Sequence, residues 1–337
     1  TNEEMLKIKV SGLNGLDVKV TKGHEILTYK DGEYKYVQSQ ELIEGDVVLT
    51  PCLYGEKTEI SSYDKDFAWL LGVYAAEGCG IPYSRITKRG RKVEWNKGIY
   101  FYCNINEKET LVKDICEKIY KIYGVSASIR MIEDSSTCLV SVYGKQIAKD
   151  FCGLCGGTSS EGDKSFSPFI MNKSSEFLLH ILGGFMSGDG CFNKNNGLQG
   201  VGVSRKLCEQ ISYICDRIGI DHSFTINTNL PGKRQDLYNV RISRKKCVLL
   251  EDICYKINSK SYIGDDFFAR NTPYYIKDNY IHRKIVSIEK INYEGDVFDL
   301  EIENKHSYIV NKICVHNSQF PLTSFNLVCK STKVLRY

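Results

Sequence analysis

The amino-acid sequence predicts a mixed fold, in which an all-β domain is interrupted by an inserted α+β domain with internal pseudo-two-fold symmetry. Three observations predict it. Residues 1–50 and 284–317 alternate apolar and polar side chains as strands do, the region between them alternates helical runs with short strands, and this middle region repeats itself. Neither β-rich flank is long enough to fold alone, so we expect the two flanks to form one domain.

Composition restricts the class of protein. The chain has 337 residues, of which 42% are hydrophobic and 26% charged, and it suits two soluble domains. No stretch approaches the roughly 20 apolar residues that cross a membrane, and the polar start is no signal peptide. The 14 Cys are scattered, with Cys152 and Cys155 the only CxxC pair, so we expect reduced thiols and not a zinc site. We expect an intracellular monomer, in the cytoplasm or nucleus, with no membrane partner.

The flanks read as strands separated by turns. In the first, Leu6–Val10 and Val18–Val20 alternate, and Asn14-Gly15 and Asp31-Gly32 are turn signals. The second flank has three such runs, which are Lys284–Ile288, Val297–Ile302 and Ser307–Val310.

The middle region contains two copies of one pattern. Phe67–Gly78 and Phe177–Gly190 each predict an apolar, small-residue helix that ends in an acid and a glycine. Each is followed by strand-like sequence and then by an amphipathic helix, Glu109–Tyr123 or Arg205–Ile218, closed by a glycine. We therefore expect two similar halves, each built of helix, sheet and helix.

The two repeated helices have a face of small residues. These residues are spaced four apart, which places them on one side of each helix and lets two backbones approach closely; they are Gly72 and Ala76, and Gly184 and Gly188. The terminal Gly78 and Gly190 suit left-handed helix caps.

Glu77 and Asp189 consequently lie at helix C-termini, where an acid opposes the helix dipole. Close helix packing would also make the two acids repel each other. A divalent cation relieves both problems, and Mg²⁺ commonly binds one or two carboxylates together with substrate phosphates. The sequence therefore predicts Glu77 and Asp189 as metal ligands at a site for phosphodiester cleavage.

The segments LLGVYAAEG (Leu70–Gly78) and LGGFMSGDG (Leu182–Gly190) resemble the paired motifs of LAGLIDADG homing endonucleases, and the resemblance covers about residues 63–275. It implies an antiparallel, saddle-shaped sheet over a double-stranded DNA target, with Mg²⁺ as cofactor and one catalytic acid per motif. Glu77 departs from the usual Asp but keeps the carboxylate. Intein-borne members add a lysine in each half, which implies Lys164 and Lys260 as groups that activate water or stabilise phosphate charge.

Basic clusters follow both motifs. Their equivalent places in the two repeats favour DNA phosphate contacts over merely solvated charges. The first cluster comprises Arg85, Lys88, Arg89, Arg91, Lys92 and Lys97, with Tyr83 and Trp95 interleaved, and the second comprises Lys233, Arg234, Arg241, Arg244, Lys245 and Lys246.

The second flank ends in His316-Asn317-Ser318. The Asn317 side-chain amide can attack its own backbone carbonyl and cleave the bond to Ser318, with His316 assisting proton transfer. The Ser318 hydroxyl can accept an acyl group by transesterification.

The context of this tripeptide resembles an intein, the self-splicing Hint domain, and in particular the vacuolar-ATPase-type inteins. Val297–Ile302 and His306–Val310 resemble the block before the splice junction, and Thr21-Lys22-Gly23-His24 resembles the TxxH block. The resemblance implies that Asp299 and His306 assist branching and cyclisation, that His24 polarises the N-terminal scissile bond, and that Thr21 orients it. Splicing requires no cofactor, and its partners are host extein sequences.

These resemblances divide the chain into a Hint N-terminal part (1–62), a LAGLIDADG endonuclease domain (63–283), a Hint C-terminal part (284–317) and a C-extein (318–337). Thr1 is not the Cys or Ser with which an intein begins, so the first Hint block is missing or displaced. In an alternative interpretation, residues 329–337 are a displaced intein N-terminus and Cys329 is its nucleophile.

The sequence thus predicts an intein that splices itself and carries a homing endonuclease. One alternative is a homing endonuclease whose degenerate Hint domain only binds DNA, which would not need the cyclising Asn317. Another is a maturase or a LAGLIDADG-type transcriptional regulator, which would not need Glu77 and Asp189.

Overall fold

The structure is a computed structural model, and it describes residues 2–52, 59–86, 91–157, 164–193, 197–228, 235–257, 274–295, 297, 300, 302 and 306–316. The chain divides into two units. The first is formed mainly by Thr1–Tyr54 and Asp265–Tyr337, and the second mainly by Gly55–His222 and Ile226–Gly264. Among the described residues, no helix is both long and apolar enough to cross a membrane.

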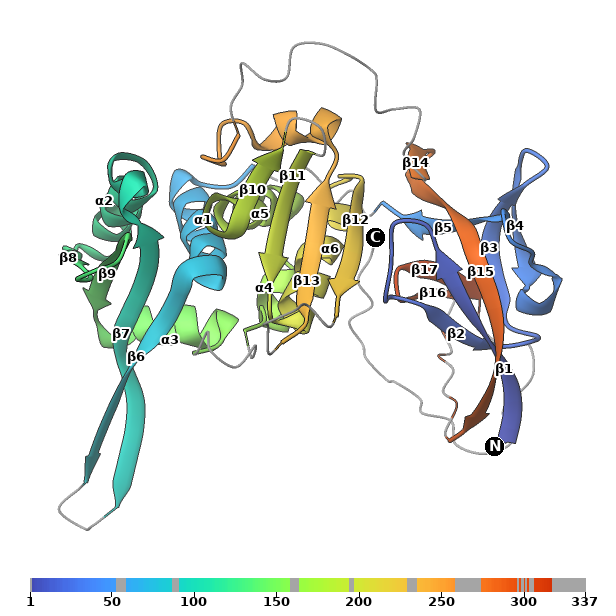
Figure 1. Cartoon of the computed structure of the whole chain (residues 1–337), viewed down its shortest axis with the longest axis horizontal. Helices are drawn as coiled ribbons and strands as arrows, with labels where there is room; N and C mark the ends of the chain where they lie inside the picture. The colour runs from blue at the N-terminus through green and yellow to red at the C-terminus, as the bar shows by residue number, and fades with distance from the viewer. Residues whose placement is uncertain are drawn as a thin grey trace. The chain divides into compact units, whose positions relative to one another are not determined.

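The first unit is built on one sheet, to which both ends of the sequence contribute (Figure 1). Its strand order is β16-β17-β3-β5-β15-β1-β2, with β4 added beside β3 and β14 beside β15. Within the described residues the strands are β1 (Asn2–Val10), β2 (Val18–Thr21), β3 (Glu25–Lys30), β4 (Glu33–Gln38), β5 (Val47–Pro51), β14 (Tyr274–Lys277), β15 (Tyr280–Glu294), β16 (Ser307–Val310) and β17 (Ile313–His316), with a short 3₁₀ turn, η1 (Ser39–Glu41).

Long-range pairing joins the two flanks. β15 runs antiparallel to β1 along most of its length, with Ile8 opposite Ile288, and its beginning pairs with β5, with Ile281 opposite Thr50. The predicted boundary between residues 283 and 284 therefore falls inside β15, and Tyr274–Arg283 belong to the first unit. In the run Val297–Ile302, the three described residues are not in a strand.

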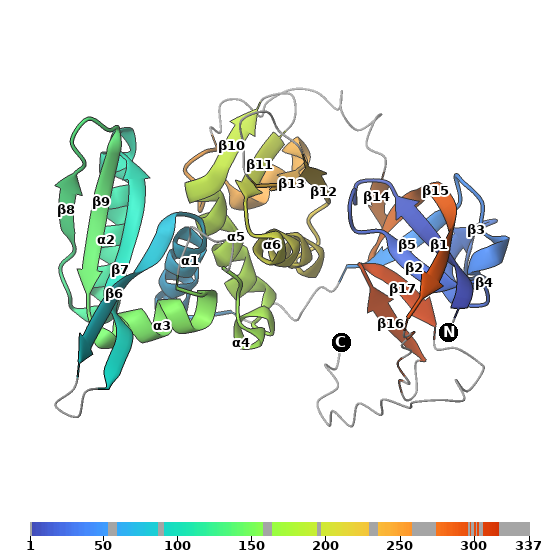
Figure 2. The same cartoon turned by 60° about the horizontal axis from the view of Figure 1, so that its bottom comes forward.

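The second unit contains two similar halves, which confirms the predicted internal repeat (Figure 2). Each half has a four-stranded antiparallel sheet, ordered β6-β7-β9-β8 in the first and β10-β11-β13-β12 in the second. The strands are β6 (Gly78–Ile86), β7 (Lys92–Asn104), β8 (Ser128–Met131), β9 (Thr137–Tyr143), β10 (Gly190–Asn193), β11 (Gly197–Gly202), β12 (His222–Asn227) and β13 (Leu237–Ile242).

Buried side chains alternate with exposed ones along the strands of these two sheets, because helices cover one face of each sheet. In β7, Ile99, Phe101 and Cys103 are buried, whereas Tyr102 on the opposite face is exposed. The helices are α1 (Ser62–Glu77), α2 (Lys113–Tyr123), α3 (Lys145–Cys155), α4 (Pro168–Met171), α5 (Ser175–Asp189) and α6 (Arg205–Arg217), with shorter turns η2 (Ile105–Glu107), η3 (Lys108–Val112) and η4 (Arg244–Leu250).

Candidate functional sites

The helices α1 and α5 lie side by side at the centre of the second unit (Figure 1). Their backbones are close enough that a Cβ added to Gly72 would lie 2.1 Å from the carbonyl oxygen of Ile181. A Cβ on Gly184 would lie 2.0 Å from the carbonyl oxygen of Trp69. Real Cβ atoms do not approach so closely, so both positions require glycine. The small-residue faces predicted from sequence are therefore the contact surface between the two helices.

The two acids end these helices, and each is followed directly by a strand. Gly188 packs against the end of α1, since its Cβ position is 2.6 Å from Cβ of Ala76 and 2.9 Å from Cγ of Glu77. The predicted left-handed caps are wrong: φ is −90° at Gly78 and −77° at Gly190, both extended. Glycine is needed there for space, because a Cβ on Gly78 would lie 2.1 Å from the Tyr74 ring.

Both carboxylates are held in an environment that disfavours their charge. Burial, followed by the proximity of Asp189 and Glu107, raises the pKa of Glu77 to about 7. Burial raises the pKa of Asp189 to about 6, although the positive charges of Lys164 and Lys256 act in the opposite direction. Acids whose pKa values are strongly perturbed cluster at functional sites.

Lys164 lies at this site, as the sequence predicted, and it is buried. Its Nζ donates to the carbonyl oxygens of Tyr74 and Ala75 at 3.0 Å and of Ala76 at 3.3 Å. These carbonyls lie at the end of α1, where helix carbonyls lack intrahelical partners, although the Tyr74 carbonyl also accepts from the backbone N–H of Gly78. Burial also lowers the pKa of Lys164. In this arrangement its ammonium caps α1 and supplies positive charge beside the acids.

Two charged residues that sequence reasoning missed complete the site. Glu107 and Lys256 form an ion pair, and together with Glu77 and Gly188 they line a pocket of about 460 Å³. Glu107 also accepts a hydrogen bond from the backbone N–H of Asn104, at 3.2 Å. The capping pattern Asn104-x-x-Glu107 was a detectable signal for the turn, but nothing local in the sequence distinguishes Lys256 from the predicted Lys260.

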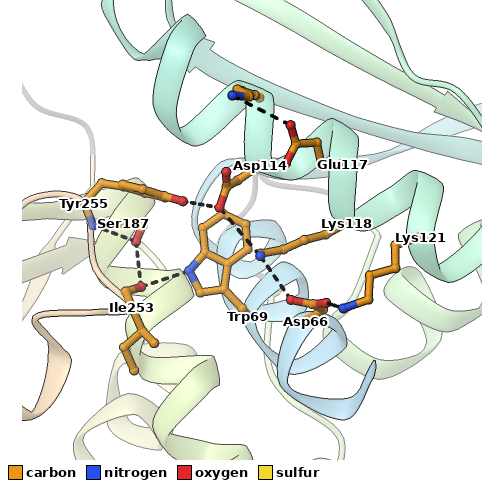
Figure 3. Close-up of polar contacts among 10 residues, drawn as sticks. Asp66, Trp69, Asp114, Glu117, Lys118, Lys121, Ser187, Ile253 and Tyr255 are labelled. Atoms are coloured by element: carbon orange, nitrogen blue, oxygen red, sulfur yellow. Dashed lines mark hydrogen bonds and ion pairs between the residues drawn. The ribbon is translucent and has the colours of Figure 1, made fainter. Parts of the chain in front are cut away.

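The segment before Lys256 is fixed to three helices (Figure 3). Trp69 of α1 donates from Nε1 to the carbonyl oxygen of Ile253 at 3.0 Å. The Tyr255 hydroxyl donates to Asp114 of α2, and its backbone N–H donates to Ser187 Oγ of α5 at 3.3 Å. These contacts anchor a segment of the second half on helices of both halves, and so place Lys256 at the pocket.

The donor set determines which cation would suit the site. Within the part of the chain that the structure describes, no group of three or more His, Cys, Asp or Glu could enclose a metal ion. Two carboxylates alone leave most coordination positions to water and phosphate oxygens. This arrangement fits Mg²⁺, which keeps several waters and binds through one or two carboxylates plus substrate phosphates.

The predicted DNA-contacting residues lie on two different parts of the repeat. Arg85, Arg91, Lys92 and Lys97 lie on or next to the β6–β7 ribbon, which extends beyond the other strands of its sheet (Figure 1). Arg241 lies on β13, and Arg244, Lys245 and Lys246 lie on η4. In the repeat, β13 and η4 correspond to β9 and α3. The predicted equivalence of the two clusters is therefore wrong.

The β6–β7 ribbon combines positive charge with aromatic rings. The rings of Tyr83 and Trp95 are 4.6 Å apart, and Arg85 lies 5.5 Å from the Trp95 ring centroid. Lys97 Nζ lies 5.8 Å from the Tyr83 ring and 5.5 Å from the Tyr143 ring. On the second sheet, exposed Arg241 donates to Gln199 Oε1 at 3.0 Å. Lys88, Arg89, Lys233, Arg234 and Lys260 lie outside the described residues.

The residues predicted for splicing belong to the first unit. His24 directly precedes β3, and His316 ends β17, the strand that pairs with β3. His306 directly precedes β16, and its ring centroid is 5.9 Å from that of His316. Thr21 ends β2 and lines a second pocket with Glu4, Lys22 and Gly23. The structure thus brings His306 and His316 together. Asp299, Asn317, Ser318 and Cys329 lie outside the described residues.

Comparison with known proteins gives matches to both units. A family model described as "Intein splicing domain" matches residues 1–317. The chain is 32% identical over 182 residues to ATP-dependent DNA helicase Hel308 of Thermococcus kodakarensis, which covers 51% of this chain and 16% of the helicase. It is 25% identical over 288 residues to a DNA polymerase of Methanocaldococcus jannaschii, which covers 80% of this chain and 16% of the polymerase. The chain thus spans less than a fifth of either protein.

Among solved structures, the chain is similar to I-DmoI crystallised with DNA and Mn, with a TM-score of 0.42 and 13% identity over 58% of this chain and 99% of that one. It is also similar to the N-terminal LAGLIDADG domain of DUF199/WhiA, with a TM-score of 0.38 and 13% identity over 60% of this chain and 89% of that one.

Proposed function

Because the chain belongs to the intein splicing domain family, we propose that it splices itself through Asn317 and Ser318 and also carries a site-specific, metal-dependent DNA endonuclease. The observation that supports the endonuclease most directly is the pairing of Glu77 and Asp189 at the ends of two closely packed helices, with both pKa values raised. Two charged acids in this environment destabilise the fold. Their placement therefore favours a role in chemistry over a role in stability.

In the proposed nuclease, the two carboxylates would hold Mg²⁺, which when bound supplies positive charge to the reacting phosphate. Lys164 stabilises the negative charge of the pair while it holds the end of α1. Lys256 lies in the pocket beside Glu77, where an ammonium can balance charge on a phosphate oxygen or on an attacking water. Because Glu77 has a pKa of about 7, it can hold or release a proton near neutral pH.

The basic residues of the β6–β7 ribbon and of β13 would contact DNA phosphates, and the exposed Tyr83 and Tyr143 would add ring contacts. The partner is a double-stranded DNA target.

There are two alternatives. In one, a degenerate splicing domain only binds DNA, which Asn317 disfavours. In the other, the chain is a maturase or regulator that does not cleave DNA, which the paired acids disfavour.

In the proposed splicing reaction, the Asn317 side-chain nitrogen attacks its own backbone carbonyl. A succinimide forms, the peptide bond to Ser318 breaks, and the leaving amino group of Ser318 takes up a proton. His316 and His306, whose ring centroids lie 5.9 Å apart, would move protons in this step, and His24 would protonate the N-terminal leaving group. Thr21 and Asp299 would assist, and Ser318 would accept the acyl chain. Similarity to the vacuolar-ATPase-type inteins in particular, and the role of Cys329, stay predictions.

The endonuclease is tested with a pool of linear duplexes that carry randomised inserts, incubated with Mg²⁺ and protein. We expect the wild type to produce cut ends enriched in one sequence. The Glu77→Gln and Asp189→Asn variants should bind the same duplex, measured with Ca²⁺ in place of Mg²⁺, but should not cut it. The Glu117→Gln variant on the exposed surface of α2, which leaves both the acid pair and the β6–β7 ribbon intact, serves as the control. Undiminished cutting by both acid variants would contradict the proposal.

A further inference from the structure

The strand pairing of the first unit places an acid beside His316. Val315 pairs with Ile26, so antiparallel register sets His316 across from Glu25. Glu25 Oε2 lies 3.5 Å from Nδ1 of His316. Both side chains are about three-quarters buried, at 23% and 24% exposed, so the contact is screened by solvent less than a surface pair would be. Nothing in the short TxxH resemblance assigns a role to the residue that follows His24.

A tyrosine supports the same imidazole from a second strand. The ring centroid of Tyr36, on β4, lies 4.8 Å from that of His316, and the two rings meet edge to face at 65°. The Tyr36 hydroxyl is 2.6 Å from Ser307 Oγ, and Ser307 is the strand partner of His316. Tyr36 also packs against the buried cluster of Leu27, Leu49 and Cys314. Its ring is therefore fixed by the core on one side and by β16 on the other.

Tyr36 contributes no negative charge to its contact with His316. Burial raises the pKa of Tyr36 to about 12, so its hydroxyl stays protonated near neutral pH. The Glu25 carboxylate lies 3.5 Å from His316 Nδ1, and the ring of His306, just before β16, lies 5.9 Å from the His316 ring.

We infer that Glu25 and Tyr36 are positioning residues for His316: the Glu25 carboxylate holds the Nδ1 side of the ring and Tyr36 fixes the ring plane, so that the imidazole is oriented for proton transfer during Asn317 cyclisation. This inference rests on the proposed splicing function. The partner of one imidazole nitrogen sets the tautomer and therefore decides which other nitrogen can take up a proton. A histidine without such a partner spends part of its time in the wrong tautomer or rotamer.

The kinetic test uses the full chain and follows the loss of the mass of residues 318–337. Glu25→Gln should slow this release roughly 10- to 100-fold, as expected when a general acid–base group loses its orientation. In a His316→Ala background the same Glu25→Gln change should have no further effect, because Glu25 acts through His316. Glu33→Gln on β4 is the matched control, and it should release the segment at the wild-type rate. A Glu25→Gln effect that persists without His316 would overturn the inference.

A second measurement is independent of splicing activity. In the Asn317→Ala chain, the ¹⁵N chemical shifts of the His316 ring report its tautomer. We expect the Nδ1–H form when Glu25 is present and a mixed population in Glu25→Gln, with Tyr36→Leu broadening the signals. Unchanged shifts in both variants would overturn the positioning role. If the wild type releases nothing, the proposed splicing function fails, but the ring shifts still decide whether Glu25 positions His316.

Discussion

At the scale of single residues, Glu77 and Asp189 are placed where their charges are least favourable. The C-terminal end of a helix repels an acid, burial removes water, and each carboxylate opposes the other. The buried ammonium of Lys164 offsets part of this cost and donates to three α1 carbonyls at the same time. The electrostatic cost that remains appears as the raised pKa values of Glu77 and Asp189.

This electrostatic cost predicts that removing one acid stabilises the fold. The pKa of Glu77 is raised from 4.5 to about 7, so the folded chain binds this proton more tightly than the unfolded chain. Stability therefore falls as pH rises from about 4.5 to about 7. At roughly 1.4 kcal/mol per pKa unit the limit is about 3 kcal/mol, and partial solvent screening reduces it. Urea unfolding of Glu77→Gln should show a gain of about 1–3 kcal/mol at pH 8 and almost none at pH 4.5.

The same titration distinguishes the acid pair from ordinary surface carboxylates. Glu94→Gln, on the exposed β6–β7 ribbon, should change stability by less than about 0.5 kcal/mol at either pH. A Glu77→Gln variant that is less stable than wild type at pH 8 would show that the carboxylate has a favourable partner, contrary to this account.

At the residue scale, the sequence predicted the site residues that belong to recognisable motifs. It missed the residues that reach a site only through long-range contacts in the fold. Glu77, Asp189 and Lys164 could be found because motifs and helix ends mark them. Glu107, Lys256, Glu25 and Tyr36 reach their sites through long-range pairing and through the anchored segment near Ile253, which no local pattern encodes.

At the scale of elements, the pair of helices α1 and α5 fixes the distance between the two acids. Gly72 and Gly184 allow backbone-to-backbone contact, and the predicted four-residue spacing of small side chains was sufficient to find this surface. The periodicity also predicted the two halves. Where the prediction failed, a local rule was applied to a position that tertiary packing decides: Gly78 and Gly190 make room for Tyr74 and Met186 instead of adopting a left-handed cap.

Widening the helix pair should therefore damage both stability and cleavage. In Gly184→Ala the new methyl group would lie 2.0 Å from the Trp69 carbonyl oxygen, so the helices must separate. We expect a loss of about 3 kcal/mol in urea unfolding and a marked fall in DNA cutting. Gly153→Ala on α3 is the matched control, because its Cβ would meet nothing within 4 Å. It should gain up to about 1 kcal/mol and keep full activity. Equal behaviour of the two variants would argue against a close helix contact.

At the scale of the whole molecule, two chemistries are assigned to two separate units. The described splicing residues, Thr21, His24, His306 and His316, lie in or next to the sheet that joins the two ends of the sequence, and the acid pair lies in the inserted repeat. The sequence predicted this interruption from the change of periodicity. It placed the boundary at 283/284 because the turn before β15 and the pairing of β14 with β15 have only weak local signals.

The proposed splicing function requires the chain to cleave itself at Asn317. Intact mass of the purified protein, followed over time at neutral pH for wild type and Asn317→Ala, tests this claim most directly. The wild type should lose the mass of residues 318–337, Asn317→Ala should not, and Glu77→Gln should behave as the wild type does. An unchanged wild-type mass, or equal loss in Asn317→Ala, would contradict it.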